Sequence, residues 1–300
     1  RLADICQNEP EIVKEVTKGS QMATRECQFQ FRNRRWNCTT TRRSLKKLLG
    51  RATRETSFLN AITAAGVAYA VTQACSAGLL PQCTCDRGRR GRRTAGVNEV
   101  PADGNWEWSG CGDNVFFGYK KSKEFMDTWH RRKSDVKTLV LLHNNEAGRM
   151  AVRNHLRTEC KCHGLSGSCT LRTCWKKMAP FRDVANRLKA KFDGASKVIP
   201  GNDGKNVLPE GATIKPPTKE DFVYLEGSPD YCEPNKKTGS MGTHGRICNH
   251  TSPGVEGCDL LCCGRGYHNE HIREKVNCRC RFRWCCEVSC DVCDVKRTIS

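Results

Sequence analysis

Cysteine placement is the feature that most constrains this chain. It carries 22 cysteines in 300 residues; eleven lie within 232–293 and eleven are spread over the first 231 residues. Thiols pair as disulfides in oxidising compartments and stay reduced in the cytosol. Two Asn-x-Ser/Thr sequons, at Asn37 and Asn249, point the same way. The sequence therefore predicts a protein secreted through the endoplasmic reticulum and Golgi into the extracellular space and matrix.

Residues 1–200 read as a helical domain. Apolar residues recur at helical spacing in 58–75, 136–151 and 181–192, and Pro180 and Gly194 suit the two ends of the last segment. We interpret these stripes as core-facing helix surfaces. No apolar run approaches the length of a membrane span, so we expect no segment that crosses a bilayer by itself. The chain begins without Met or an apolar leader, so we expect any signal peptide to be absent from it.

The remainder has a different composition. Residues 201–230 are rich in Gly and Pro and predict a linker. Residues 231–300 have few apolar stripes and a cysteine about every six residues, so the segment needs crosslinks to be stable. The predicted fold is disulfide-rich α+β. It has an N-terminal helical bundle carrying a stapled hairpin, and a small C-terminal cysteine-rich β-hairpin domain.

The net charge of +19 comes from 51 Lys and Arg against 32 Asp and Glu. Basic residues are densest in 28–54, which holds nine and no acid, and in 87–93. One interpretation is a solvated basic face. The other is attraction to a polyanion that weakens with salt, and for a secreted protein this is heparan sulfate and not nucleic acid.

Six cysteines near the C-terminus are nested about one point. Cys278 with Cys293 and Cys280 with Cys290 are both centred near residue 285, as disulfides across a hairpin (278–293) would be. The vicinal pair Cys285 and Cys286 lies at the turn. Apolar Phe282, Trp284 and Val288 alternate with charged residues around it. They either pack on the small domain or form an exposed tip for a partner, and we favour the second.

A second nested set lies in 160–174. Pairing Cys160 with Cys174 and Cys162 with Cys169 places Ser166 at the apex, between Gly164 and Gly167, which permit tight turns. Each crosslink stabilises such a loop by ~2–4 kcal/mol. A hydroxyl held at a rigid apex is easily presented as a nucleophile.

Three functions compete for this loop. Cys160, Cys162 and His163 could bind a metal, but their spacing is a poor match to zinc sites and the oxidising context disfavours free thiolates. Ser166 could be a hydrolase nucleophile, but Ser168 replaces the second Gly of the Gly-x-Ser-x-Gly elbow. Ser166 could instead be modified by another enzyme, which residue chemistry alone does not separate from a structural loop. We expect no metal, cofactor or catalytic site.

With these residues in view, the chain resembles the Wnt family of secreted signalling proteins. The resemblance runs along nearly the whole chain, with the sixth subgroup expected to be nearest. It is carried by residues 26–38, 106–111, 143–149, 160–175 and the Trp284-Cys285-Cys286 hairpin.

The resemblance implies a function for both hairpins. The acyltransferase Porcupine would attach a mono-unsaturated fatty chain to Ser166, and the carrier Wntless would escort the ligand to the surface. The acylated loop would act as a thumb and the C-terminal hairpin as an index finger on the cysteine-rich domain of Frizzled receptors, joined by LDL-receptor-related co-receptors. Membrane association would be through the lipid only. The implied contacts are His163, Gly164, Leu165, Ser166 and Gly167 in the thumb, and Phe282, Trp284, Cys285, Cys286 and Val288 in the finger.

The resemblance also implies glycans on Asn37 and Asn249 and further disulfides. These are Cys27–Cys38, Cys75–Cys83, Cys85–Cys111, Cys232–Cys263, Cys248–Cys258 and Cys285–Cys286. Family members usually have one more cysteine near the C-terminus, expected to pair with Cys262, and this chain stops at Ser300 without it. We therefore expect a chain trimmed by a few residues, with Cys262 unpaired, and Cys6 has no obvious partner either.

Two other functions remain open at this point. One is a matrix protein that binds glycosaminoglycan without Frizzled signalling. The other is a secreted lipase or esterase using Ser166, for which no elbow and no His or Asp partner can be assigned.

Overall fold

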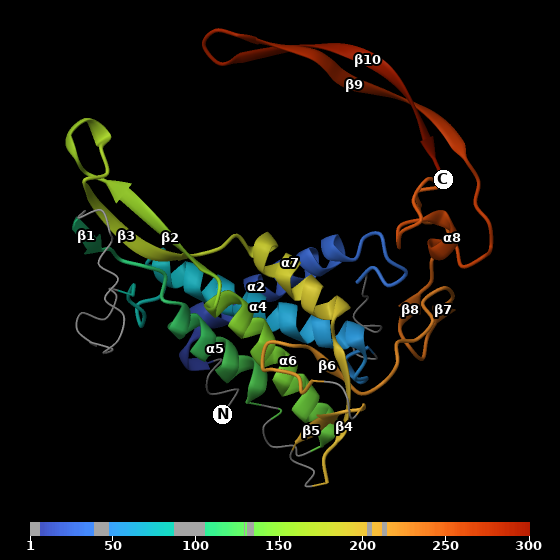
Figure 1. Ribbon diagram of the computed structural model, residues 1–300, viewed down its shortest axis with the longest axis horizontal. Helices are drawn as coiled ribbons and strands as arrows, with labels where there is room; N and C mark the ends of the chain where they lie inside the picture. The colour runs from blue at the N-terminus through green and yellow to red at the C-terminus, as the bar shows by residue number, and fades with distance from the viewer. Residues whose placement is uncertain are drawn as a thin grey trace. The chain divides into compact units, whose positions relative to one another are not determined.

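The structure is a computed structural model that describes residues 7–38, 48–86, 106–128, 130, 135–202, 206–211 and 215–300. The chain forms two compact units, which are described separately (Figure 1). The first comprises 1–30 and 46–228, and the second comprises 31–45 and 229–300.

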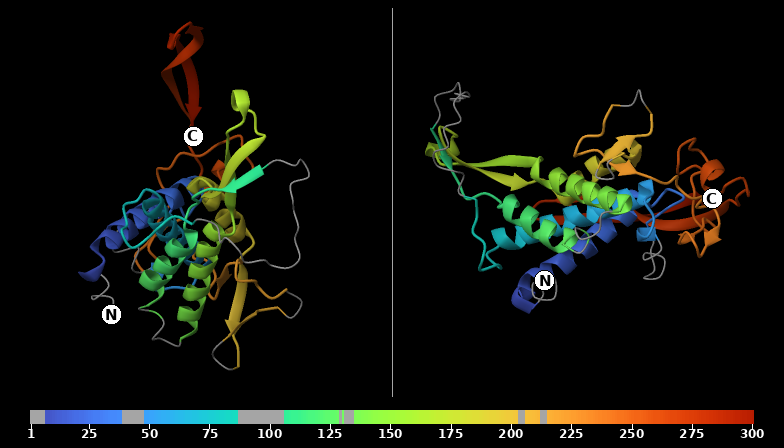
Figure 2. Two further views of the ribbon diagram at one scale, coloured as in Figure 1. Left: turned by 90° about the vertical axis from the view of Figure 1, so that its left-hand side faces the viewer. Right: turned by 90° about the horizontal axis from the view of Figure 1, so that it is seen from below.

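Among the described residues, five helices form the body of the first unit (Figures 1 and 2). They are α2 (Pro10–Gln30), α4 (Arg54–Ser76), α5 (Val115–Asp127), α6 (Val136–Arg153) and α7 (Phe181–Asp193). The other four all pack against α4. Contrary to the expectation that no apolar segment has the length of a membrane span, α4 is, among the described helices, long and apolar enough to cross a membrane, but 78% of its apolar window is buried inside the unit. Its all-round apolar surface therefore fits a central core helix.

Close backbone contacts fix the helix positions. Gly19 of α2 and Gly66 of α4 touch: a Cβ built on either would lie 2.5 Å from the carbonyl oxygen of the other. The predicted stripes 58–75, 136–151 and 181–192 lie in α4, α6 and α7. All five apolar positions of the last stripe are buried: Phe181, Val184, Ala185, Leu188 and Phe192.

A buried ionic cluster joins α5 to α6. The Arg149 guanidinium donates to both carboxylate oxygens of Asp127, at 3.1 and 2.8 Å, and the side chains are 1% and 3% exposed. Arg149 also donates to Glu146, which accepts a hydrogen bond from the Tyr119 hydroxyl. Burial, and then that hydrogen bond, raise the pKa of Tyr119 to about 12.

A hairpin projects from the helical body of this unit (Figures 1 and 2). Its strands β2 (Leu156–Cys162) and β3 (Leu171–Met178) are antiparallel, and Cys160 lies opposite Cys174. Strand β1 (Trp106–Ser109) pairs in parallel with β3, giving the order β1-β3-β2.

The predicted linker 201–230 is wrong in part, because much of it packs into the first unit. Strands β4 (Ser196–Pro200), β5 (Val207–Pro209) and β6 (Val223–Tyr224) form a small sheet. Phe222 and Val223 are fully buried. Ser57 donates to the Val223 carbonyl at 2.7 Å, and Asn144 accepts from the Val223 amide at 3.1 Å.

The second unit has short elements and one long hairpin. The elements are β7 (Pro234–Asn235), β8 (Ser240–Met241), α8 (Cys258–Leu261), β9 (Glu270–Arg283) and β10 (Glu287–Ile299). Residues 31–45, expected in the N-terminal domain, belong to this unit. The Trp36 ring lies 4.8 Å from that of Phe31 and 6.4 Å from that of Tyr231. The Arg246 guanidinium donates to the backbone carbonyls of 32, 34 and 35.

Disulfides crosslink both units. The predicted pairs Cys75–Cys83, Cys85–Cys111, Cys160–Cys174, Cys162–Cys169, Cys232–Cys263, Cys248–Cys258, Cys278–Cys293 and Cys280–Cys290 are confirmed. Cys27 and Cys38 are each disulfide-bonded. The predicted Cys285–Cys286 bond is wrong for this structure: both thiols are free, with their sulfurs 3.9 Å apart. Cys262 is unpaired, and Cys6 lies outside the described residues.

Candidate functional site

The loop that carries Ser166 is closed by backbone bonds and two disulfides. The ladder of β2 and β3 continues to the His163 amide, which donates to the Leu171 carbonyl at 2.7 Å. Beyond it, the Gly164 amide donates to the Ser168 carbonyl at 2.9 Å. The Cys160–Cys174 and Cys162–Cys169 bonds cross the hairpin below this turn. The apex is therefore one short, closed turn.

Ser166 has a left-handed backbone conformation, with φ 56° and ψ 26°. This region costs a non-glycine residue roughly 1–2 kcal/mol and persists only where the surroundings impose it. Gly167, with φ +76°, continues the turn at no such cost. The loop closure holds Ser166 in this conformation at the tip.

The Ser166 side chain is exposed, and its neighbour Leu165 is 93% exposed. Among the described residues, no hydrogen-bond partner is found for the Ser166 hydroxyl. The Ser168 hydroxyl differs, since it lies 3.2 Å from the Thr170 hydroxyl. Of the two serines, Ser166 is the one whose oxygen is open to another protein.

The geometry argues against the two competing chemistries. Cys160 and Cys162 are in disulfides and so cannot act as thiolate ligands with His163. Across the described part of the chain, no group of three His, Cys, Asp or Glu side chains is placed to hold a metal ion. The His163 ring lies 3.0 Å from the Thr173 hydroxyl. His163 is the histidine nearest to Ser166 in the sequence. Its imidazole is therefore in contact with Thr173, a residue that the sequence did not single out.

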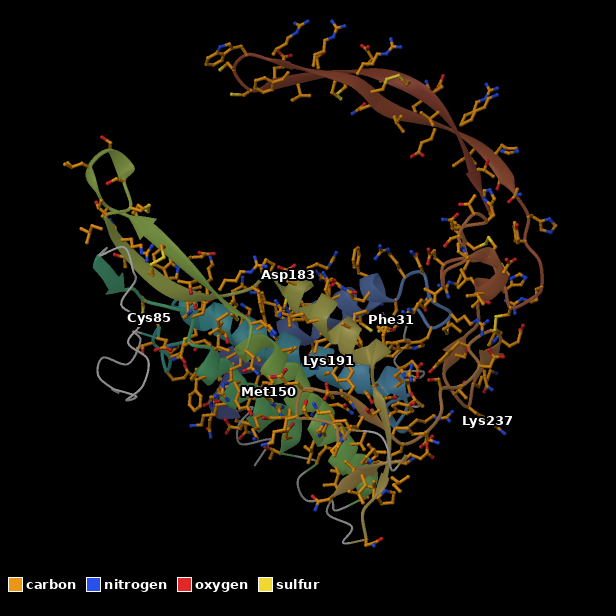
Figure 3. All side chains as sticks on the ribbon, in the orientation of Figure 1. Phe31, Cys85, Met150, Asp183, Lys191 and Lys237 are labelled. Carbon is orange, nitrogen blue, oxygen red and sulfur yellow. A yellow bond between two sulfur atoms is a disulfide. The ribbon has the colours of Figure 1, made fainter. Side chains whose placement is uncertain are left out.

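The tip of the β9–β10 hairpin exposes a group of apolar side chains (Figure 3). Phe282 lies opposite Val288, and they are 74% and 61% exposed. Trp284 in the turn is 91% exposed. These side chains do not pack on the rest of the small domain, so the exposed-tip interpretation fits. Cys285 and Cys286 make the turn with φ 70° and 82°.

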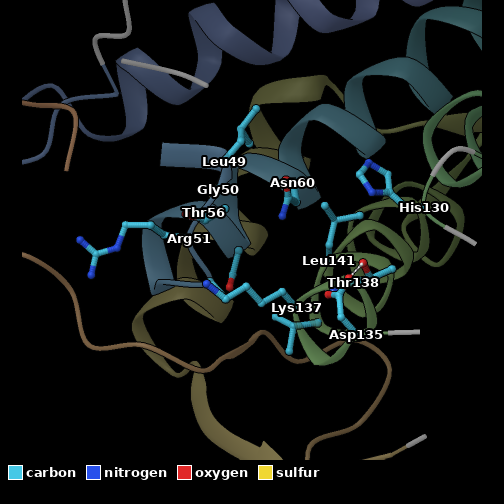
Figure 4. A pocket seen from close by; sticks show the side chains of 13 residues that line it. Leu49, Gly50, Arg51, Thr56, Asn60, His130, Asp135, Lys137, Thr138 and Leu141 are labelled. Carbon is cyan, nitrogen blue, oxygen red and sulfur yellow. Dashed lines mark hydrogen bonds between the residues drawn. The ribbon is translucent and has the colours of Figure 1, made fainter. Parts of the chain in front are cut away.

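The first unit also contains a cavity of about 220 Å³ between α4, α6 and residues 49–52 (Figure 4). Charged and polar groups line much of it, including Arg51, Asn60, Asp135 and Lys137. The cations are already engaged, because Glu226 bridges Arg51 at 3.1 Å and Lys137 at 2.8 Å. No residue of the 160–174 loop lines it. Its polar wall does not suit a fatty chain.

The two sequons differ in their surroundings. Asn249 is exposed, and its side-chain oxygen accepts from the Thr251 amide at 3.1 Å and hydroxyl at 2.8 Å. Asn37 is half-buried, and its Thr39 lies outside the described residues. The basic cluster 87–93 and residues 39–47 of the other basic segment also lie outside them.

Comparison with known proteins gives one consistent result. The Wnt family profile matches residues 1–300. Protein Wnt-6 from Mus musculus and from Homo sapiens are each 53% identical, covering 100% of this chain and 86% of theirs. Protein Wnt-1 from Ambystoma mexicanum is 46% identical, covering 95% of this chain and 78% of its own.

Solved structures agree with the fold. The WNT8A chain in a complex with human WLS superposes with a TM-score of 0.66 at 38% identity, covering 95% of this chain and 92% of that one. The N-terminal domain and linker of Drosophila WntD give a TM-score of 0.51 at 20% identity, covering 74% and 98%, which supports the fold alone. The profile, the relatives and the disulfide-rich α+β fold together show that this chain belongs to the Wnt family of signalling ligands.

Proposed function

We propose that this chain is a secreted, acylated Wnt ligand that grips the cysteine-rich domain of Frizzled receptors with its two hairpins. The observation that carries the proposal is the exposed, unpartnered Ser166 hydroxyl at the apex of the doubly stapled loop. In this proposal Porcupine acylates Ser166 with a mono-unsaturated fatty chain. The serine oxygen attacks the carbonyl of an acyl thioester, the C–S bond breaks, and the thiol leaves with the proton.

The lipid would supply most of the affinity. Burying a dozen methylenes at ~0.8 kcal/mol each contributes on the order of 10 kcal/mol before ordering costs. A chain of methylenes distinguishes little beyond groove shape. Leu165, 93% exposed beside Ser166, would add apolar area at the same contact, together with His163, Gly164 and Gly167.

The finger would supply selectivity through its own side chains, which a lipid contact does not provide. Its exposed Trp284, Phe282 and Val288 form an apolar tip of the kind that dominates binding energies. Cys285 and Cys286 hold the turn that presents them. An LDL-receptor-related co-receptor would bind elsewhere on the ligand.

The route of the ligand follows from the same chemistry. An attached lipid makes free diffusion in water unfavourable, so a carrier is needed. The similarity to WNT8A, solved in a complex with WLS, supports Wntless in that role. Passage through the endoplasmic reticulum and Golgi fits the disulfides and the exposed Asn249 sequon, where a glycan is expected, as at Asn37.

Intact-mass spectrometry tests the proposal directly. Wild type, Ser166→Ala and Ser168→Ala are co-expressed with the acyltransferase, and binding to a Frizzled cysteine-rich domain is measured for each. Wild type and Ser168→Ala should carry one acyl mass and bind, and Ser166→Ala should lose both. Full receptor binding by wild type without an acyl mass would refute the lipid mechanism.

A further inference from the structure

Asn60 is a polar residue in the central apolar helix of the first unit. It lies in α4 between Leu59 and Ala61, which are both buried. Asn is disfavoured in the interior of a helix, because its side chain competes with the helical hydrogen bonds of the backbone. The residue is only 9% exposed, so its amide is withdrawn from bulk solvent. A buried amide of this kind needs hydrogen-bond partners.

The protein does not supply those partners. Among the described residues, no hydrogen bond joins the Asn60 amide to another group, and its oxygen and nitrogen are not enclosed by protein atoms. They are instead open to the cavity of about 220 Å³ that this side chain lines (Figure 4). Other hydroxyls of the wall are engaged: Thr56 donates to the Leu48 carbonyl at 3.2 Å. Thr138 donates to the Asp135 carboxylate at 3.0 Å. Asn60 is thus the polar group that the cavity leaves available.

The Lys, Arg, Asp and Glu side chains around the cavity balance in charge. Arg51 and Lys137 line it with two positive charges. Glu226 bridges these two cations, and Asp135 adds a second negative charge to the wall. An ion that entered would lose its hydration without meeting an unpaired opposite charge. The cavity therefore favours a neutral ligand.

The size and the apolar part of the wall limit the ligand further. A volume of about 220 Å³ is about seven times the ~30 Å³ share of one water molecule. It is smaller than the roughly 300–1,000 Å³ of pockets that hold drug-sized ligands. Leu49, Val140 and Leu141 contribute apolar surface to the wall. A small molecule with one apolar part and one polar group fits this combination.

We infer that this cavity binds a small neutral molecule through its carboxamide group. The Asn60 side chain presents a C=O acceptor beside an N–H donor, and a carboxamide presents the complementary pair, so two parallel hydrogen bonds can form. A ketone only accepts, and a carboxylate only accepts and is charged. This site goes beyond the proposed function, because no residue of the 160–174 loop or of the β9–β10 hairpin lines the cavity.

Three probes of nearly equal shape test the inference on the wild-type full chain. Benzamide, acetophenone and benzoate differ only in the group attached to the ring, and their binding is measured by saturation-transfer and titration NMR. Benzamide should bind with a Kd in the roughly millimolar range, and the other two should bind at least about fivefold more weakly. Equal binding of acetophenone would mean that apolar surface alone selects the ligand. Tighter binding of benzoate would mean that Arg51 and Lys137 select an anion. Either result, or no binding of benzamide, would overturn the inference.

A substitution at Asn60 tests the role of its amide. Asn60→Leu keeps the size of the side chain and should weaken benzamide binding at least about tenfold. Its urea midpoint should match or exceed that of wild type, because the amide has no partner among the described residues and loses none. Asn186→Leu, the same change at an exposed position of α7, is the control and should leave benzamide binding unchanged.

Benzamide binding retained by Asn60→Leu would place the ligand elsewhere and overturn the inference. The comparison of the three probes on wild type needs no variant, so it decides the inference even if Asn60→Leu folds poorly. The acyl mass on Ser166 and Frizzled binding should be unchanged in both variants. Failure of this inference is therefore distinguishable from failure of the proposed function.

Discussion

Cys160 and Cys174 lie directly opposite each other in the register of β2 and β3, and a disulfide joins them. The strand ladder already holds these two positions together. Cys162 and Cys169 differ, because Cys169 lies outside β3 and the ladder does not hold it opposite Cys162. The disulfide nearer the apex is thus the one that fixes the conformation of the loop around Ser166.

The Cys160–Cys174 disulfide should therefore contribute more to the stability of the fold, and the Cys162–Cys169 disulfide more to the acylation of Ser166. Removing Cys160–Cys174 by a double Ala substitution opens the longer loop and should cost about 3 kcal/mol of unfolding free energy. Removing Cys162–Cys169 should lower the unfolding free energy by less. It should reduce the acylation of Ser166 by more, because the turn that presents this serine loosens. Urea unfolding and intact mass measure the two effects. Equal loss of acyl mass in both variants would contradict the inference that Cys162–Cys169 is the disulfide that fixes the loop around Ser166.

The part of each hairpin that could be predicted from the sequence is the part reflected in the symmetric spacing of its cysteines. Nested cysteine spacings gave the pairing and the apex of both hairpins, since a crosslinked hairpin imposes a common midpoint. The same spacings could not give the left-handed conformation of Ser166, which depends on how the turn closes. The Cys285–Cys286 bond that the resemblance implies is not formed, because adjacency brings the two cysteines close without setting their bonding.

Some helices of the first unit could likewise be predicted from the sequence, and others could not. Helix α7 was predicted because large apolar residues follow its buried face. Helix α2 gave no such pattern, because its buried face includes Glu15, Gly19, Ala23 and Glu26. The Gly and Pro content of 201–230 predicts a linker. Its buried core residues, Phe222 and Val223, are adjacent and too few to show any periodicity in the sequence.

Trp284 should matter for binding and not for folding. It is 91% exposed, so Trp284→Ala should change the unfolding free energy by less than about 0.5 kcal/mol. As an anchor of the proposed finger it should contribute at least about 2 kcal/mol to Frizzled binding, or roughly 30-fold in Kd. Val255→Ala, at another exposed apolar position of the same unit, is the control for both measurements. Unchanged affinity in Trp284→Ala would remove the finger from the receptor contact.

The Arg149–Asp127 pair should be among the most sensitive polar positions of the helical body. Arg149→Met leaves the Asp127 carboxylate buried, with the Asn145 amide at 3.1 Å as a remaining donor. Loss of one partner of a buried pair costs about 3–5 kcal/mol. Arg157→Met breaks the exposed pair with Asp183 and should cost less than about 1 kcal/mol. Similar shifts in urea midpoint for the two variants would show that burial does not set the difference.

The contact of Gly19 with Gly66 predicts a steep steric penalty. Alanine favours a helix over glycine by about 1 kcal/mol, so Gly66→Ala would stabilise an isolated α4. In the fold its methyl group would meet the Gly19 carbonyl oxygen at 2.5 Å, and overpacking of this kind costs about 1–3 kcal/mol or more. Gly227→Ala, where nothing lies within 4 Å, should be neutral or slightly stabilising. Thermal unfolding that ranks Gly66→Ala at or above wild type would mean that α2 can shift away from α4.

Asp221 should make part of the stability depend on acid pH. Partial burial disfavours its charge, but hydrogen bonds from Lys191 at 2.7 Å and from the Thr218 hydroxyl and amide outweigh burial and lower the pKa of Asp221 to about 2. A carboxylate with a lowered pKa contributes stability above its ordinary pKa of 3.8, and this is lost as the pH falls toward 2. The contribution should be about 1 kcal/mol or less, because solvent screens the partly exposed pair. Urea unfolding of wild type and Asp221→Asn between about pH 5 and pH 2 should show their stabilities converging as the pH falls. A constant difference across that range would mean that Asp221 acts through hydrogen bonding that does not depend on its charge.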